Sequence, residues 1–316
     1  MSGFDFYGIS HIIYVYLFVE VLYMETNTGI NAEFLLERTL QKKSPELHNR
    51  FKSSVLVLTH MLSGYQQVFP NFTDHTELHS MNVINFCNYL IGEENIGLLN
   101  EDEIYVLLMS CYIHDIGMGI RESDYDKFIS DLGLGSKTTG DIQQDIRKFH
   151  NEFSGLFIKK YADLFDIPSE EHLFAIIQIS RGHRKTDLFD EKEYPSALKL
   201  SNGNTICLPY LSLLIRLADE IDVAADRNSI LLYCVDDYTE EGSHIAFTTH
   251  EAIRTMKIEP DSFVLMVHAK DDWVMENVRD LAEKMQETLD YCREVAEKRC
   301  PIRISQSKIV INELPQ

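Results

Sequence analysis

Side chains suited to binding a divalent metal ion recur along the first two thirds of the sequence. They are His79, the adjacent pair His114 and Asp115, His150, His183 and Asp219. Similar intervals separate them, and each interval is long enough for one helix and a turn. Helical bundles build metal sites from inward-facing side chains on separate helices. Imidazole and carboxylate ligands without a thiolate suit one or two ions of Mn²⁺, Fe, Co²⁺, Ni²⁺, Mg²⁺ or Zn²⁺.

The pair His114-Asp115 is the most informative of these positions. It directly follows the apolar run IYVLLMSCYI and is followed at once by Ile116 and Gly117. Burying an imidazole and a carboxylate beside such a run is costly unless the two groups are paired or bind a cation. The sequence therefore predicts metal ligands here, with a buried hydrogen-bonded network as the alternative.

The elements that must position these residues are predicted to be helices. Asn100 with three acidic residues after it, Ser169 and Pro209 are typical of helix starts. Apolar spacing predicts helices over 45–70, 75–91, 100–117, 141–164, 170–181 and 209–225. Residues 131–141 are expected to form a loop, and Asn202-Gly203 a β-hairpin with a type I′ turn.

The sequence pattern changes after residue 228, where runs of strand-forming residues replace the helical spacing. Strands are expected over 229–236, 243–249, 254–259, 262–269 and 302–312, with a long amphipathic helix before the last. The fold class is therefore mainly α, with a small C-terminal α+β module. Three parts are predicted: an apolar helical extension over 1–44, a helical domain over 45–228 and the α+β module over 229–316.

Composition excludes some classes of protein. The 316 residues are 45% hydrophobic, which rules out wholesale disorder, and the net charge of −21 makes general nucleic-acid binding unfavourable. None of the six cysteines forms a C-x-x-C pair, so a cytoplasmic location is expected. The apolar segment 9–24 is short and contains His11 and Glu20, so we expect no membrane span. We expect it to be buried in the fold or covered by a partner protein or a second copy.

Three stretches carry a resemblance to a known family. They are DHTELHSMNV at 74–83, IHDIG at 113–117 and LSLLIRLADEIDVAADRN at 211–228. Over about residues 45–228 the chain resembles the HD-domain metal-dependent phosphohydrolases, whose ordered pattern is H…HD…D. The resemblance implies an HD-domain helical bundle. It also implies metal ligation by His79, His114, Asp115 and Asp219.

Two further stretches resemble particular HD branches. KFHNEFSGLFI places His150 four residues before Ser154, and IIQISRGHRK supplies His183. In branches with two ions, histidines at such places bind the second ion, and in dNTP triphosphohydrolases a similar one is catalytic. The chain departs from the HD-GYP pattern by having HDIGM in place of HDIGK and by lacking a doubled histidine near residue 183. The tail is most similar to a bacterial branch often joined to a GHKL-type ATPase module.

This resemblance implies hydrolysis of a nucleotide or another small phosphoester or phosphoanhydride. Asp115 would bridge two ions if His150 and His183 hold the second, and otherwise His150 would act as general acid. Arg184, Lys185 and His75 are candidates for substrate binding. Arg216 is expected to form an ion pair within the site or with Glu220, and Asp222 and Asp226 to lie on a solvated face. Two alternatives remain: a nucleotide-sensing module without turnover, and a metal-dependent single-stranded nuclease.

Overall fold

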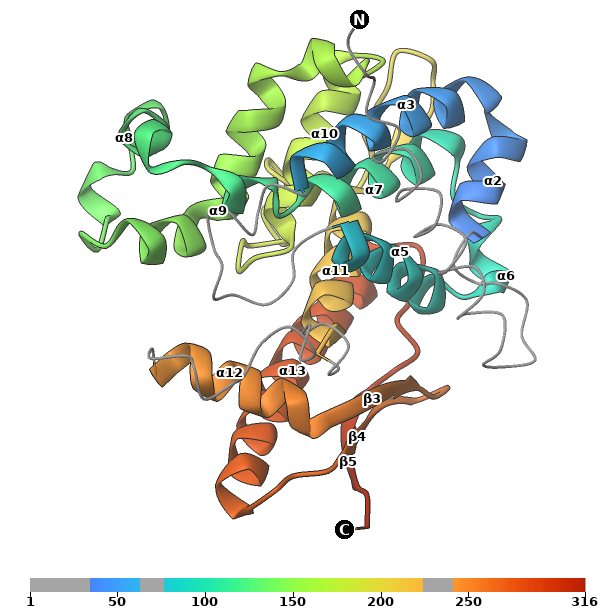
Figure 1. Ribbon diagram of the computed structural model, residues 1–316. Helices are drawn as coiled ribbons and strands as arrows, with labels where there is room; N and C mark the ends of the chain where they lie inside the picture. Colours follow the sequence, from blue (N-terminus) through green and yellow to red (C-terminus); the bar gives the residue numbers. More distant parts are fainter. Residues whose placement is uncertain (1–34, 63–76, 224–240, 316) are drawn as a thin grey trace, which may run out of the picture. The chain divides into compact units, whose positions relative to one another are not determined.

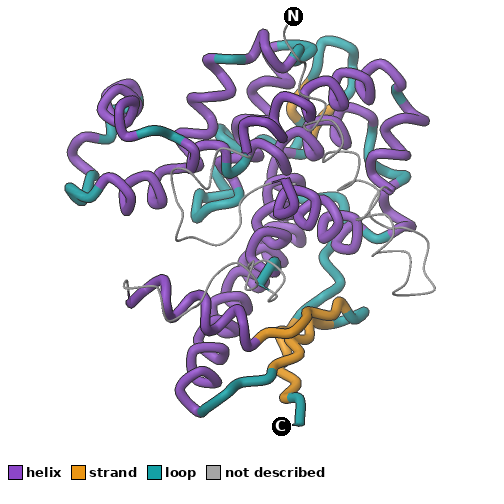
Figure 2. The backbone as a smooth tube through the Cα atoms, in the orientation of Figure 1, coloured by secondary structure: helices purple, strands orange, loops and turns teal. Residues whose placement is uncertain are grey.

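The computed structural model describes residues 35–62, 77–223 and 241–315, all within one compact unit that spans 33–316. Most of these residues are helical, with two small sheets (Figure 2). This confirms a mainly α fold with a small C-terminal α+β module. The apolar segment 9–24 and the strand predicted over 229–236 lie outside the described residues. The division at residues 44 and 228 stays a prediction.

Figure 1 labels the first described helices, and the His114-Asp115 pair directly follows the last of them, α7 (Glu101–Ile113). α7 begins with a capping box, in which the Asn100 side chain accepts from Glu103 N and the Glu103 carboxylate accepts from Asn100 N. This reciprocal pair satisfies donors that a helix start otherwise leaves free. These elements are α2 (Leu35–Lys43), α3 (Pro45–Leu62), α5 (Glu77–Ile91), α6 (Glu93–Ile96) and α7 (Glu101–Ile113).

The next elements carry the remaining candidate ligands. Asp141 caps α9 and Ser169 caps α10, while Pro209 occupies the first turn of α11. The loop predicted over 131–141 follows a helix over 122–131 and contains a short 3₁₀ turn, η3. The elements are η2 (Ile116–Gly119), α8 (Glu122–Asp131), η3 (Gly135–Lys137), α9 (Ile142–Lys160), η4 (Ala162–Phe165), α10 (Glu170–Gly182) and α11 (Leu208–Ile221).

α7 is the most deeply buried of these helices. Every one of its residues from Asp102 to Ile113 is buried. It packs against α2, α3, α5, α10 and α11. A helix that is apolar on all sides must lie inside a bundle, since no face of it tolerates water. The His114-Asp115 pair therefore emerges from the centre of the helical core.

The predicted hairpin is present, but its turn type was wrong. β1 (Leu198–Lys199) pairs antiparallel with β2 (Thr205–Ile206). Gly203 N donates to Leu200 O, so Asn202-Gly203 occupies the third and fourth positions of the turn. Gly203 alone of this pair has a positive φ, of 94°, whereas a type I′ turn requires positive φ at both central residues. The loop is instead one residue longer.

The C-terminal module joins a three-stranded sheet to a long helix. β3 (Ile253–Ile258) pairs antiparallel with β4 (Ser262–Val267), and β4 pairs parallel with β5 (Lys308–Glu313). These strands agree with three predicted ones, although β5 begins later than expected. α13 (Asp272–Arg299) packs against β5 and against α11. The module is thus in direct contact with the helix that carries Asp219.

The strand predicted over 243–249 was wrong, because this stretch lies in α12 (Glu241–Ala252). Phe247, Thr248 and Thr249 favour strands by local propensity. In the structure all three are buried in a helix that packs on α13 and β3. Tertiary burial has overridden local preference here.

Across the described segments, no single helix is both long and apolar enough to cross a membrane. Only the bent pair made by Glu101–Gly119 and Glu122–Asp131 meets those criteria when taken together.

Candidate metal centre

The candidate ligands come from five helices that end or pass near one point. Three of them lie within helices, and the other three lie at or just beyond helix ends, where the chain can turn a side chain inward. His79 is in α5, His114 and Asp115 follow α7, His150 is in α9, His183 caps the end of α10, and Asp219 is in the last turn of α11.

Four of these residues form one group whose ligand atoms all lie within 4.8 Å of one another: His79, His114, Asp115 and Asp219. His79 Nε2 is 3.2 Å from His114 Nε2 and 3.3 Å from Asp219 Oδ1. Asp115 Oδ2 lies 3.6 Å from the first of these nitrogens and 3.4 Å from the second. This group has the composition and spacing of a single cation site.

Asp115 also belongs to a second group, with His150 and His183. Its Oδ1 lies 3.2 Å from His150 Nε2 and 3.5 Å from His183 Nε2, and the two nitrogens are 2.8 Å apart. Each carboxylate oxygen of Asp115 therefore faces a different group. A carboxylate placed in this way can bridge two cations.

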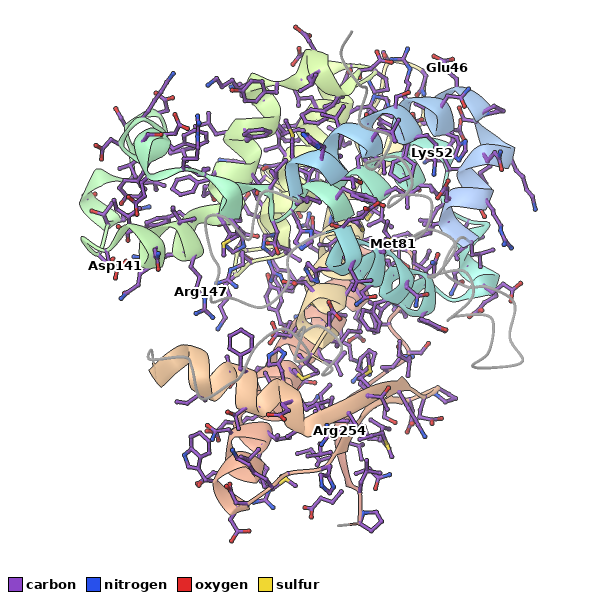
Figure 3. The ribbon with its side chains drawn as sticks, in the orientation of Figure 1. Glu46, Lys52, Met81, Asp141, Arg147 and Arg254 are labelled. Atoms are coloured by element: carbon purple, nitrogen blue, oxygen red, sulfur yellow. The ribbon has the colours of Figure 1, made fainter. Side chains whose placement is uncertain are left out.

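In every histidine ring of the two groups, Nδ1 points away from the centre and lies within hydrogen-bond distance of an acceptor. The Nδ1 atoms of His114, His150 and His183 donate to the carbonyls of Cys111, Arg147 and Ser180, which lie three residues before each ring. Figure 3 marks Arg147 on α9, beyond the capping residue Asp141. Because a carbonyl only accepts, the proton of each neutral ring lies on Nδ1. The lone pair is then on Nε2, which faces the centre.

This arrangement fits a bound cation. Two pairs of Nε2 atoms meet at 3.2 and 2.8 Å, and neutral rings with outward protons would bring lone pairs together there. Burial lowers the pKa of His183 well below its usual range, and the nearby His150 and His114 lower it further. Protonation of that ring is therefore unfavourable. A divalent cation among the nitrogens and carboxylates would remove the repulsion.

Asp219 is the most accessible ligand, with its side chain 21% exposed, whereas those of His79 and Asp115 are 1% and 6% exposed. Burial would raise its pKa, as would the Asp115 carboxylate, but the hydrogen bond to His79 and the electrostatic influence of His79 and His114 outweigh them. Its pKa is held well below the usual range, so Asp219 is ionised at neutral pH. The site is thus anionic and reachable from the side of Asp219.

Ser154 and Gly117 hold the His114-Asp115 turn against α9. The Ser154 hydroxyl donates to His114 O at 2.7 Å and accepts from Gly117 N at 2.9 Å. A Cβ on Gly117 would lie 2.1 Å from His150 O, so only glycine permits this approach. Ser154 and Gly117 are thus required at these positions because they let the turn pack closely against α9.

Asp222 is a functional candidate whose position was predicted wrongly. It was expected on a solvated face, but α11 ends at Ile221 and Asp222 turns inward with 2% exposure. Its Oδ2 lies 2.6 Å from His79 Nδ1, and its Oδ1 accepts from Asn82 Nδ2 at 3.3 Å. Its burial could have been predicted from its position between the apolar residues Ile221 and Val223, since a carboxylate between buried apolar residues needs a partner.

Arg216 was expected to form an ion pair, and the structure shows a different role. Its Nε donates to Gly182 O at 2.8 Å and its Nη2 to Thr186 O at 2.9 Å. Its guanidinium also lies over the Tyr291 ring, 5.1 Å from the centroid. It therefore ties the turn after His183 to α13.

Of the proposed substrate-binding residues, Arg184 and Lys185 are described by the structure, and neither belongs to a ligand group. Arg184 and Lys185 follow His183 directly and are exposed. Burial and the Asp219 charge raise the pKa of Glu220, while Arg184 and Lys185 act to lower it, so both cations lie near the last turn of α11. His75 and Asp226 lie outside the described residues.

Comparison with known proteins gives one match. The model of a family called HD-CE matches residues 69–301, well over half of the chain. This range includes both ligand groups and most of the C-terminal module. No curated protein and no solved structure matches the chain.

Proposed function

The chain belongs to the HD-CE family, an HD-domain family, and on that premise we propose that it is a metal-dependent phosphohydrolase. The family match confirms that the H…HD…D motifs belong to an HD-domain family, while the similarity to the GHKL-associated branch stays a prediction. The observation that carries the proposal is the convergence of four Nε2 atoms and the carboxylates of Asp115 and Asp219. The expected substrate is a nucleotide or another small phosphoester or phosphoanhydride.

Each residue has a role that follows from its contacts. His79, His114, Asp115 and Asp219 would hold the first cation, and Asp115 with His150 and His183 would hold a second. A divalent cation there supplies Lewis acidity toward a phosphoryl oxygen and lowers the pKa of a bound water. Without a second ion, a protonated His150 Nε2 would give its proton to the leaving oxygen.

Charge supports a small substrate over a long polynucleotide. The chain carries a net charge of −21, which repels an extended phosphate backbone. Arg184 and Lys185 are exposed and adjoin His183, so they would neutralise the few phosphates of a small ligand.

The test is an activity screen with a matched inactive variant. The full chain is stripped of metal, reloaded with Mn²⁺ and incubated with nucleoside mono-, di- and triphosphates and cyclic dinucleotides. We expect phosphate or nucleotide release that requires Mn²⁺ and is lost in Asp115→Asn. Metal-loaded protein that releases nothing from any substrate, or full activity in the variant, contradicts the proposal.

A nucleotide sensor without turnover is the second candidate, because α13 contacts the segment after His183. Leu188 N donates to the Tyr291 hydroxyl at 2.7 Å, and Arg299 donates to Leu188 O and Tyr194 O. A structural change on nucleotide binding at the site would be transmitted through these contacts to the C-terminal module. A nucleotide that raises the melting temperature without being consumed identifies a sensor. Cleavage of single-stranded DNA would instead identify a nuclease.

A further inference from the structure

The contact between His79 and Asp222 differs from the other outer contacts of the ligand histidines. His114, His150 and His183 each donate from Nδ1 to a neutral backbone carbonyl of their own helical segment. His79 Nδ1 instead meets the Asp222 carboxylate, 143 residues away in sequence, at 2.6 Å. This ring therefore lies between a buried negative charge and the four-ligand group.

Asp222 lies behind the ring of His79, outside the ligand group itself. His79 Nε2 faces His114 Nε2 and Asp219 Oδ1, while Nδ1, on the other side of the ring, faces Asp222. The second carboxylate oxygen accepts from Asn82, one turn after His79 on α5. Asp222 is 2% exposed and His79 is 1% exposed, so water weakens this contact little.

We propose that Asp222 is a positioning residue that fixes the proton of His79 on Nδ1 and makes the four-ligand group the tighter of the two cation sites. The role assigned to Asp222 rests on the metal site of the proposed function. A carboxylate that accepts the outer proton of an imidazole fixes the ring orientation and raises its basicity as a ligand. The rings of the second group have only carbonyls behind them, so they lack this added charge.

The two groups also differ in total charge. The four-ligand group contains the carboxylates of Asp115 and Asp219 with Asp222 behind it, whereas the second group has Asp115 alone. Affinity for a hard divalent cation rises with the number of carboxylates that face it. The first equivalent of cation therefore goes to the group that contains His79.

The test measures metal binding, independently of turnover. The metal-free full chain and the variants Asp222→Asn and Asp222→Ala are titrated with Mn²⁺, followed by calorimetry and by the paramagnetic resonance of free Mn²⁺. We expect the tighter Kd to weaken roughly 10- to 100-fold in Asp222→Asn, which keeps an acceptor but loses the charge. Asp222→Ala loses both and should weaken it further. The weaker Kd should change less than threefold in both variants.

Asp102→Asn is the matched control, because it also removes a buried carboxylate that contacts a histidine. Asp102 Oδ1 lies 2.8 Å from His172 Nε2, and neither residue belongs to a ligand group. We expect its two Mn²⁺ affinities to stay within about twofold of the original protein. Equal weakening in Asp102→Asn and Asp222→Asn would show general destabilisation and overturn the proposal. So would unchanged binding in both Asp222 variants, or a chain that binds no Mn²⁺.

A further variant covers the case in which the Asp222 variants do not fold. Asn82→Ala removes the contact to the other oxygen of Asp222 but keeps its charge. We expect it to weaken the tighter site severalfold, and unchanged binding would count against the proposal. Hydrolysis is assayed separately. If the protein hydrolyses substrate but its Mn²⁺ Kd does not change in the Asp222 variants, only the role of Asp222 is refuted. If Mn²⁺ binding depends on Asp222 but no substrate is hydrolysed, only the proposed hydrolase activity is refuted.

Discussion

Gly117 sets the distance between the His114-Asp115 turn and α9. A methyl group there would lie 2.1 Å from His150 O and 2.7 Å from Ser154 N, which are backbone atoms that cannot rotate away. Gly117→Ala must therefore push α9 outward and His150 with it. We expect a loss of about 1–3 kcal/mol in the free energy of unfolding, together with weaker Mn²⁺ binding.

Gly119 provides the control for that substitution, because it lies in the same turn and no atom lies within 4 Å of its added Cβ. Gly119→Ala should change the free energy of unfolding by less than about 0.5 kcal/mol. Urea denaturation of both variants, with and without Mn²⁺, checks the comparison. Equal effects of the two substitutions would show that close packing at Gly117 is unimportant.

For single residues, the sequence was informative where polar residues interrupt an apolar segment. His114 and Asp115 stand out because they directly follow an apolar segment whose residues are all buried. Asp222 meets the same criterion between Ile221 and Val223, but the expected helix continued past it and placed it on the surface. The error lay in the helix end, since the inward turn of Asp222 depends on α11 stopping at Ile221.

Asp102 joins three elements at the start of α7. Its carboxylate accepts from His172 on α10 and from Asn202 and Asn204 in the hairpin loop. Burial would raise its pKa, but these hydrogen bonds outweigh burial and leave the pKa below its usual value. Asp102→Asn should lower the free energy of unfolding by about 2 kcal/mol near neutral pH.

The effect of Asp102 should depend on pH with a definite sign. Its pKa is lower in the folded protein than in the unfolded chain, where it is about 3.9. As the pH falls, the unfolded chain takes up the proton first. The stabilisation by Asp102 is therefore complete above pH ~4 and is lost as the pH falls through the folded-state pKa. Urea denaturation of protein and variant at several pH values should show the gap closing in acid, and a constant gap contradicts this.

Arg216 connects α11, the turn after His183 and α13. It donates to the carbonyls of Gly182 and Thr186 and stacks on Tyr291. A lysine keeps the charge but cannot reproduce a planar fork that bonds in two directions and stacks. Arg216→Lys should therefore cost about 1–3 kcal/mol of unfolding free energy and loosen His183.

Thermal and urea unfolding check that expectation, and Mn²⁺ titration reports on the His150-His183 group. Arg121→Lys is the control, because Arg121 forms an exposed ion pair with Asp124 and such pairs contribute little. If Arg216→Lys is as mild as Arg121→Lys, the connection through Arg216 is not important for stability.

The helices that carry the ligands were predictable because apolar spacing, caps and proline agreed with their burial. Elsewhere, the stretch 243–249 and the hairpin turn were predicted wrongly, for physical reasons. The stretch 243–249 has strand-forming residues, and only packing on α13 and β3 makes it helical. The hairpin turn depends on which residues pair across it, and Asn202-Gly203 fits more than one register. In the first case the deciding contacts are distant in sequence, and in the second they are the strand pairs on either side of the turn.

Cations in the two ligand groups would together connect five helices, so their removal should affect the whole fold. Ligands that bind only the folded state stabilise it, by about 2.7 kcal/mol at 100 times the Kd. Chelation should therefore lower the melting temperature, and added Mn²⁺ should restore it. The Asp115→Asn variant should show neither change in a thermal scan. A melting temperature that ignores both chelator and Mn²⁺ contradicts metal binding in the folded state.

Three of the four histidine rings are oriented by main-chain carbonyls, which no amino-acid substitution can delete. Substitutions that shift the choice of metal are therefore expected at the carboxylates and the rings themselves. Among the outer contacts described for these rings, the one to Asp222 is made by a side chain, so a single codon change can alter it. A library at this position would explore cation preference while the candidate ligands stay as they are.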